Sequence, residues 1–569
     1  MTGGWTALTW LARLYPADVE SSDTLDRSLG FLDAPIPPET VVRAGYGAAV
    51  ATVPVVALGL LVVPPPLLPL GLLVALACLL GVVHAVHTAP QLLATARRTR
   101  ALGDAPALVG RVVLRMRITP TTETAAAFAA AEGHGPLADS LADHVRRAAG
   151  RAGSGLPTFS AEWAEWFPAL RRALLLVESA DTAPASERER TLDRGLEVVL
   201  DGAREEMAEF AAGLEGPTTG LYAFGVLLPL ALVALLPATR MAGVAVPLPL
   251  VVLLYDVLLP CVVLAASAWL LSRRPVTFPP PRIERPHPDL PERRWPAVGV
   301  GVAGSVVGWV GSTVLVGGWT GPLAALGVGL GSGLVVHYRA VKAVRDRVRA
   351  VEAGLTDALY YIGRRVEEGH AVETAIAAAA EEVPDATGDV LADAARRQRQ
   401  LKVGVREAFL GDHGALAHVP SPRARSTATL LALAAREGRP AGGAVVAMAD
   451  NLSEMAAVER DARHETATVT STLANTAAVF GPLVAGATVA MSDGMAFGGE
   501  LAASGGPTTA GLGLAVGLYV LALAVVLTVL STGLSRGLDR ALVGYRVGVA
   551  LLAATVTYLV TVAAVGTLL

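Results

Sequence analysis

Apolar residues in this chain collect into long runs that are separated by charged blocks. Nine runs approach the roughly 20 residues that a helix needs to cross a bilayer. They cover approximately residues 44–63, 67–88, 218–237, 247–272, 296–317, 320–337, 473–491, 509–532 and 547–568. A backbone in hydrocarbon must satisfy its own hydrogen bonds, and a helix does so within one segment. The pattern therefore predicts a polytopic membrane protein with about nine transmembrane helices.

Two long charged blocks, 90–217 and 338–471, lie between these runs. In the second block, apolar residues recur at helical spacing from Leu355 to Val366 and give one apolar face. Gly369 comes next and suits the C′ position that ends a helix, and a second helix is expected from about Val372. Sustained alternation of apolar and polar residues is missing, so we expect both blocks to be all-α helical bundles.

The order of runs and blocks predicts a domain organisation in which each block is bracketed by membrane helices. The N-terminal segment contains several acids and no basic n-region, so we expect no signal peptide. The expected parts are a cap (1–43, with a helix near 22–32), membrane helices 1–2 (44–89), a first helical domain (90–217), membrane helices 3–4 (218–272), a Pro-rich linker (273–295), membrane helices 5–6 (296–337), a second helical domain (338–471) and membrane helices 7–9 (472–569).

Arginine and lysine near the ends of the runs predict the orientation, because these residues stay on the cytoplasmic side. Cations follow the second run at Arg97, the fourth run at Arg273 and the sixth run at Arg339. Further cations, including Arg540, lie between the eighth and ninth runs. All of these positions fall on one side if the N-terminus also lies there. We therefore expect a multi-pass protein of the cell membrane with both helical domains and the N-terminus in the cytoplasm, and the C-terminus outside.

The two blocks share a sequence pattern at a constant separation of 250 residues. Glu123-Thr124-Ala125 matches Glu373-Thr374-Ala375, and the pattern Asp-x-Leu-Ala-Asp-x-x-Arg-Arg occurs at both 139–147 and 389–397. A repeat of this length indicates a duplicated domain. Its acids are Asp139, Asp143, Asp389 and Asp393. They fit either a solvated helix with ion pairs one turn apart or a docking face for a cytosolic protein, and both interpretations stay open.

Charge and motifs restrict the chemistry. The chain has 46 Lys and Arg against 50 Asp and Glu, which leaves no basic excess for nucleic acid. The first block carries 15 cations and 18 acids and the second carries 18 and 19, so both are mixed-charge surfaces suited to proteins. The phosphate-binding Gly-x-x-x-x-Gly-Lys-[Ser/Thr], His-Glu-x-x-His and Cys-x-x-Cys do not occur. We therefore expect that the chain is not an enzyme and has no cofactor or metal site. Any energy that it uses would come from a partner or from an ion gradient.

Two features of the apolar runs each have two interpretations. Asp256 lies in the middle of the fourth run, where a carboxylate is costly and marks either a functional site or a polar residue in helix packing. Glycines four residues apart, such as Gly304 and Gly308 or Gly513 and Gly517, permit close helix approach. They fit either packing within one chain or the seam of a homodimer.

The topology and a set of short motifs resemble the type II secretion system F-domain family. The second block has an apolar helix at 355–366, then Glu368-Gly369 and a further helix. Arg436-Glu437-Gly438 comes later, before Gly442-Gly443 and a helix through Met455. The long archaeal form, related to tight-adherence and type IV pilus inner-membrane platform proteins, is the most similar. The first block departs from this pattern, with Thr119 opposite Gly369 and Ser179-Ala180 opposite Glu437-Gly438.

The resemblance implies a platform without enzymatic activity of its own. In this family a cytosolic hexameric ATPase is thought to act on the cytoplasmic domains while prepilin subunits leave the bilayer for a growing filament. The residues it suggests for protein contacts are Gly369, Glu437 and Gly438, beside the four repeated acids. A secondary transporter with a site at Asp256 is the alternative, although transporters usually place their function at the bilayer midplane rather than in large helical blocks.

Overall fold

The computed structural model describes residues 2–32, 34–61, 65, 68–133, 135–150, 153–241, 246–274, 287, 295–437, 441–496 and 508–568. Within these ranges every regular element is a helix, and nine helical stretches are long and apolar enough to cross a membrane. An all-α polytopic fold was predicted from the apolar runs, and this level of the prediction is confirmed.

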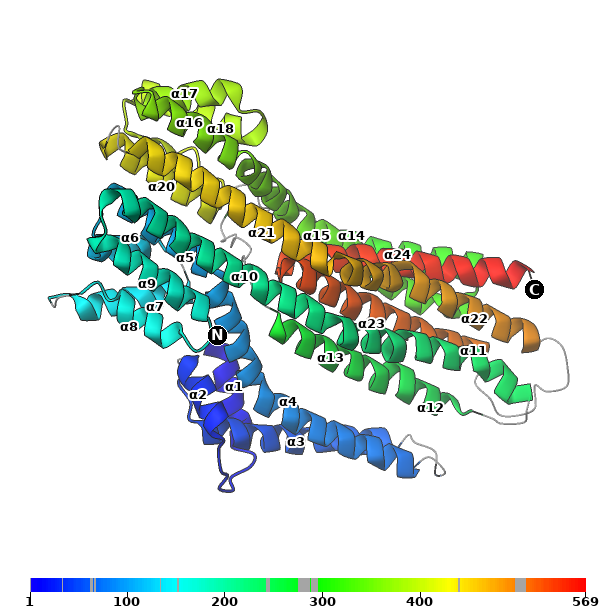
Figure 1. The fold of residues 1–569 in the computed structure, drawn as a ribbon. Helices are drawn as coiled ribbons and strands as arrows, with labels where there is room; N and C mark the ends of the chain where they lie inside the picture. Colours follow the sequence, from blue (N-terminus) through cyan, green and yellow to red (C-terminus); the bar gives the residue numbers. More distant parts are fainter. Residues whose placement is uncertain are drawn as a thin grey trace.

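The helical domains lie at one end of the molecule and the apolar helices extend from them to the other end (Figure 1). The N-terminal helices are α1 (Thr2–Ala12), α2 (Asp23–Phe31), α3 (Pro38–Leu60) and α4 (Leu68–Gly103). The first helical domain contains α5 (Ala105–Ile118), α6 (Thr122–Glu132), α7 (Pro136–Ala148), α8 (Leu156–Trp163), α9 (Pro168–Thr182) and the start of α10 (Ala185–Tyr222). The second contains the end of α15 (Gly321–Ala353), α16 (Leu355–Glu367), α17 (Val372–Glu382), α18 (Asp385–Leu401), α19 (Val405–Leu410), α20 (Pro422–Glu437) and the start of α21 (Ala441–Asn475).

The remaining helices form the membrane bundle. They are α11 (Leu228–Met241), α12 (Leu248–Val252), α13 (Leu259–Arg273), α14 (Trp295–Leu315), α22 (Gly481–Ala496), α23 (Thr509–Arg536) and α24 (Arg540–Leu568). Three π-helical segments interrupt this bundle: η2 (Ala223–Leu227), η3 (Leu253–Leu258) and η5 (Thr476–Phe480). The α3–α4 hairpin lies beside the bundle and meets it where α4 contacts α13 (Figure 1).

Four long helices run without a break from apolar sequence into the helical domains. They are α4 with 36 residues, α10 with 38, α15 with 33 and α21 with 35. The predicted domain borders near 89, 217, 337 and 471 all fall inside these helices. Pro90 inside α4 and Pro217 inside α10 each remove one backbone hydrogen bond, whereas α15 and α21 have no interior proline. Each of the four is therefore a helical connection between a domain and the apolar helices, and α15 and α21 are the stiffer two.

The two helical domains have hydrophobic cores that extend into each other. The core of the second domain is built mainly from α16–α21 but includes Leu114 of α5. The core of the first domain is built mainly from α5–α10 but includes Met455 and Val458 of α21. Gly110 on α5 faces the side-chain amide of Asn451 on α21, where a Cβ atom would leave no room. The domains are therefore packed as one body.

Glycines hold the membrane helices together inside the chain. A Cβ atom built at Gly308 of α14 would lie 2.7 Å from the carbonyl oxygen of Ala324 on α15. One built at Gly331 would lie 2.9 Å from the carbonyl oxygen of Gly548 on α24. Gly513 and Gly517 of α23 face Trp319 and Leu323 in the same way. Of the two interpretations of the glycine spacing, the structure therefore favours packing within one chain.

Candidate interaction surfaces and the intramembrane aspartate

Gly369 ends α16 in the way that the sequence predicted. Its φ of 98° lies in the left-handed region, which costs glycine little. Its N–H donates to the carbonyl oxygen of Val366 at 3.0 Å, and the N–H of His370 donates to that of Arg365 at 3.0 Å. These two bonds form a Schellman motif and satisfy carbonyls that the helix end would leave free. The exposed turn after the helix is therefore fixed in shape.

The end of α16 packs closely against the start of α21. A Cβ atom built at Gly442 would lie 2.8 Å from Cγ of Glu367, and one at Gly363 would lie 2.7 Å from Cγ2 of Val446. Gly442 therefore permits the close approach of these two helices, while a Cβ atom at Gly443 would meet only an ordinary contact, 3.5 Å from Oε1 of Glu367. Of the predicted Glu437-Gly438 turn, Glu437 is the last residue of α20, and Gly438 lies outside the described residues.

The repeated acids divide into paired and unpaired positions. Asp143 forms an ion pair with Arg146, and Asp393 forms ion pairs of 2.8 Å with both Arg396 and Arg397. These contacts are the one-turn pairs that the spacing predicted, and they contribute little free energy on an exposed helix.

Asp139 and Asp389 occupy equivalent positions of the two motifs and have a different environment. Both side chains are exposed, and neither makes an ion pair within the described part of the chain. An unpaired exposed carboxylate is available to a partner, so these two acids are the stronger docking candidates of the four.

Asp256 lies in the π-helical segment η3, and its Oδ1 is buried without a hydrogen-bond partner. The preceding residue, Tyr255, donates its hydroxyl to the carbonyl oxygen of Pro229 at 2.6 Å. Across the ranges that the structure covers, no group of three or more His, Cys, Asp or Glu lies together as metal ligands would. π-Helical segments often occur at functional sites, which keeps Asp256 a candidate.

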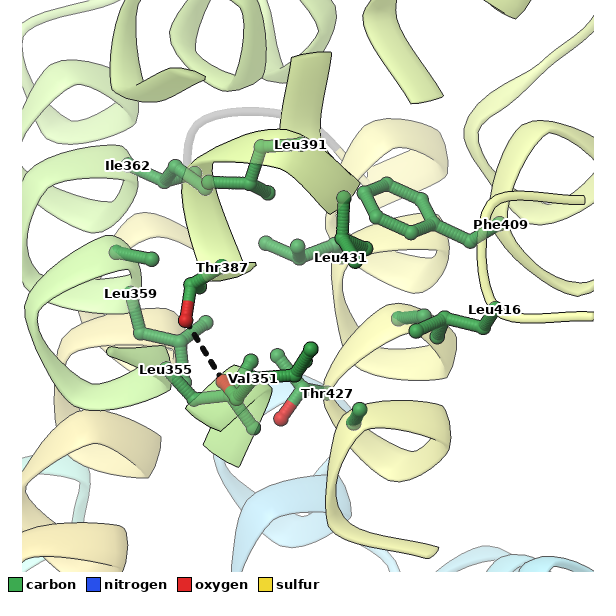
Figure 2. Close-up of a pocket in the computed structure, with 14 residues that line it drawn as sticks. Val351, Leu355, Leu359, Ile362, Thr387, Leu391, Phe409, Leu416, Thr427 and Leu431 are labelled. Carbon is green, nitrogen blue, oxygen red and sulfur yellow. Dashed lines mark hydrogen bonds between the residues drawn. The ribbon is translucent and has the colours of Figure 1, made fainter. Parts of the chain in front are cut away.

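A small void lies in the core of the second helical domain. Figure 2 shows that its lining is almost entirely aliphatic, with Leu355, Leu359 and Leu431 facing Phe409 and Leu416. The hydrogen bond drawn there runs from the Thr387 hydroxyl to the carbonyl oxygen of Val351, at 2.8 Å. Its volume of about 20 Å³ has room for about one water molecule, so it is a packing defect rather than a ligand site.

Two contacts between distant segments were not predicted from the sequence. Arg345 of α15 forms a buried ion pair with Asp539, in the turn between α23 and α24. Phe31 of the N-terminal cap packs edge-on against Trp163 and Trp166 of the first helical domain, with ring centroids 6.1 and 6.4 Å apart. The first contact joins the second helical domain to the bundle, and the other joins the cap to the first helical domain.

No protein-family model, curated protein or solved structure matches this chain. The arrangement of the chain's own residues is therefore the basis for inferring its function.

Proposed function

We propose that this chain is the membrane platform protein of a type IV pilus-like or type II secretion assembly machine. In this role it couples a cytosolic hexameric secretion ATPase to the transfer of prepilin subunits from the bilayer into a filament. The observation that carries the proposal is the set of four continuous helices, α4, α10, α15 and α21, which join two packed helical domains to the membrane bundle. A machine that converts ATPase motion into displacement in the bilayer needs helical connections of this kind.

Matching helices in the two domains support the proposed duplication. Helix α6 spans Thr122–Glu132 and α17 spans Val372–Glu382, so both ends differ by 250 positions. The π-helical segments Ala223–Leu227 and Thr476–Phe480 come directly after α10 and α21, and their starts differ by 253 positions. Each domain would then connect to the bundle through an equivalent helix with an equivalent irregularity, as expected if both domains transmit the same motion.

The proposed ATPase contact includes Asp139 and Asp389, together with the turn at Gly369 and the Glu437-Gly438 turn. Complementary charges guide association and discriminate between partners. We expect the double variant Asp139→Lys, Asp389→Lys to lose co-purification of the cytosolic ATPase while inserting normally into the membrane. Glu205→Lys, at another exposed acid on α10, is the matched control and should retain the ATPase. Equal recovery of ATPase with both proteins would argue against this docking surface.

Secondary transport is the second candidate, and the buried unpaired oxygen of Asp256 is the observation that favours it. A carboxylate that binds a proton or cation during transport cannot be replaced by an amide of the same shape. Asp256→Asn should then abolish substrate uptake by the protein in liposomes. If Asp256→Asn instead supports filament assembly at the normal level, the aspartate serves packing and the platform proposal stands.

A further inference from the structure

A pocket of about 250 Å³ opens between the two helical domains, separate from the void inside the second domain. Arg115, Thr124, Phe128 and Glu132 line it from α5 and α6 of the first domain. Arg406, Thr429 and Arg436 line it from α19 and α20 of the second, together with Ala432 and Leu433. The Thr429 hydroxyl lies 3.5 Å from Oε2 of Glu132, which places the two domains in contact at the pocket wall.

The charges around this pocket are unbalanced. Three arginines and a single glutamate give the lining a net charge of +2. Within the described part of the chain, none of Arg115, Arg406 and Arg436 makes an ion pair. Glu132 also interacts electrostatically with Arg111 behind the pocket, so its charge is shared. Arg406 and Arg436 are exposed and Arg115 is half-buried, so a bound anion would supply a counter-charge to three guanidinium groups that form no ion pair in the described chain.

The remaining lining groups indicate the shape of such an anion. The hydroxyls of Thr124 and Thr429 already donate to the carbonyl oxygens of Thr121 and Arg425, each at 3.0 Å. The donors left for a ligand are the guanidinium groups, which match the oxygen geometry of phosphate. Phe128 and Leu433 provide an apolar wall beside these polar groups. A volume of about 250 Å³ leaves room for a diphosphate group or a phosphate with part of a ring.

We propose that this pocket binds a small phosphate-bearing ligand, which contacts both helical domains at once. Arg115 would hold the phosphate oxygens from the first domain, and Arg406 and Arg436 from the second. Because the ligand contacts both sides of the interface, its binding stabilises the docked arrangement of the domains. This inference does not depend on the platform proposal, since it concerns only the residues of the pocket.

Calorimetric titration of the purified full-length protein in detergent tests the site. The probes are sodium pyrophosphate and ADP, with the ionic strength held constant by sodium chloride. We expect both probes to bind, and Arg115→Gln and Arg436→Gln each to weaken binding about tenfold, as the loss of one charge-assisted hydrogen bond does. Arg172→Gln, at an exposed arginine of α9 away from the pocket, is the matched control and should bind as the unchanged protein does.

Phe128→Leu separates two sources of the phosphate. If the natural ligand is a nucleoside phosphate, this variant weakens ADP and leaves pyrophosphate unchanged. If the natural ligand is free pyrophosphate, Phe128→Leu binds pyrophosphate and ADP as tightly as the unchanged protein does. The proposal is overturned if neither probe gives heat of binding, if the pocket variants bind as tightly as Arg172→Gln, or if only an acidic peptide such as poly-glutamate binds.

Discussion

A close helix contact in the second helical domain gives a sharp test of its packing. Gly363 lies on the buried face of α16, against α21. A Cβ atom at this position would lie 2.7 Å from Cγ2 of Val446, 3.0 Å from its backbone nitrogen and 3.3 Å from the carbonyl oxygen of Gly442. Carbon atoms pack best at about 3.5–4.0 Å, so Gly363→Ala forces the two helices apart by roughly 0.5–1 Å.

The expected cost combines two opposing effects. Overpacking of a tight core costs about 1–3 kcal/mol, while alanine in place of glycine within a helix gains up to ~1 kcal/mol. The net result for Gly363→Ala is a loss of about 1 kcal/mol, and the larger Gly363→Val should cost more. Gly213 on α10 has no atom within 4 Å of its Cβ position, so Gly213→Ala is a control that gains helix propensity alone.

Hydrogen exchange measured by mass spectrometry on the intact protein in detergent reports the local opening of α16. A loss of about 1 kcal/mol raises the exchange rate of its amides about fivefold. Gly213→Ala should leave α16 unchanged and protect α10 slightly more. Amides of α16 that exchange at the same rate or more slowly in Gly363→Ala would refute the reasoning, because they would show that α16 and α21 separate at no cost.

Three further changes are expected to affect the melting temperature in detergent. Asp539→Ala removes the buried carboxylate that pairs with Arg345 and should destabilise the protein by about 3–5 kcal/mol. A shift equivalent to less than about 1 kcal/mol would contradict a buried pair. Tyr519→Phe removes the buried hydrogen bond from the tyrosine hydroxyl to the carbonyl oxygen of Gly225 and should cost about 1–2 kcal/mol. An unchanged melting temperature would mean that the carbonyl finds another donor. Asp143→Ala breaks an exposed ion pair and should change stability by less than about 0.5 kcal/mol, and a larger loss would show a role beyond that pair.

Features determined by neighbouring residues were predictable from the sequence. The apolar face from Leu355 to Val366 gave helix α16, because side chains three and four positions apart share one face. Gly369 ended that helix because no other residue adopts a φ of 98° so readily. The apolar runs gave the candidate membrane spans for a similar reason, since length and composition are properties of a single segment.

Contacts between distant segments were not predictable in the same way. Arg345 and Asp539 are separated by 194 positions, and the sequence marked nearby cations only as indicators of membrane orientation. The three arginines of the interdomain pocket come from helices that no local pattern brings together. Glycine spacing predicted close helix approach at Gly308, but the partner on α15 is determined only by the tertiary fold.

In the proposed platform role, the shared cores would couple the two helical domains to each other. Leu114 contributes to the core of the second domain, and Met455 and Val458 contribute to the core of the first. Moving one domain alone would expose these side chains, and burying a side chain of this kind stabilises a protein by about 1.5–3 kcal/mol. If a partner does less work on one domain than this separation costs, both domains would move together. Helices α10 and α21 would then transmit the motion to the bundle at the same time. A ligand in the interdomain pocket would raise the free-energy cost of separating the two domains, because it contacts both of them.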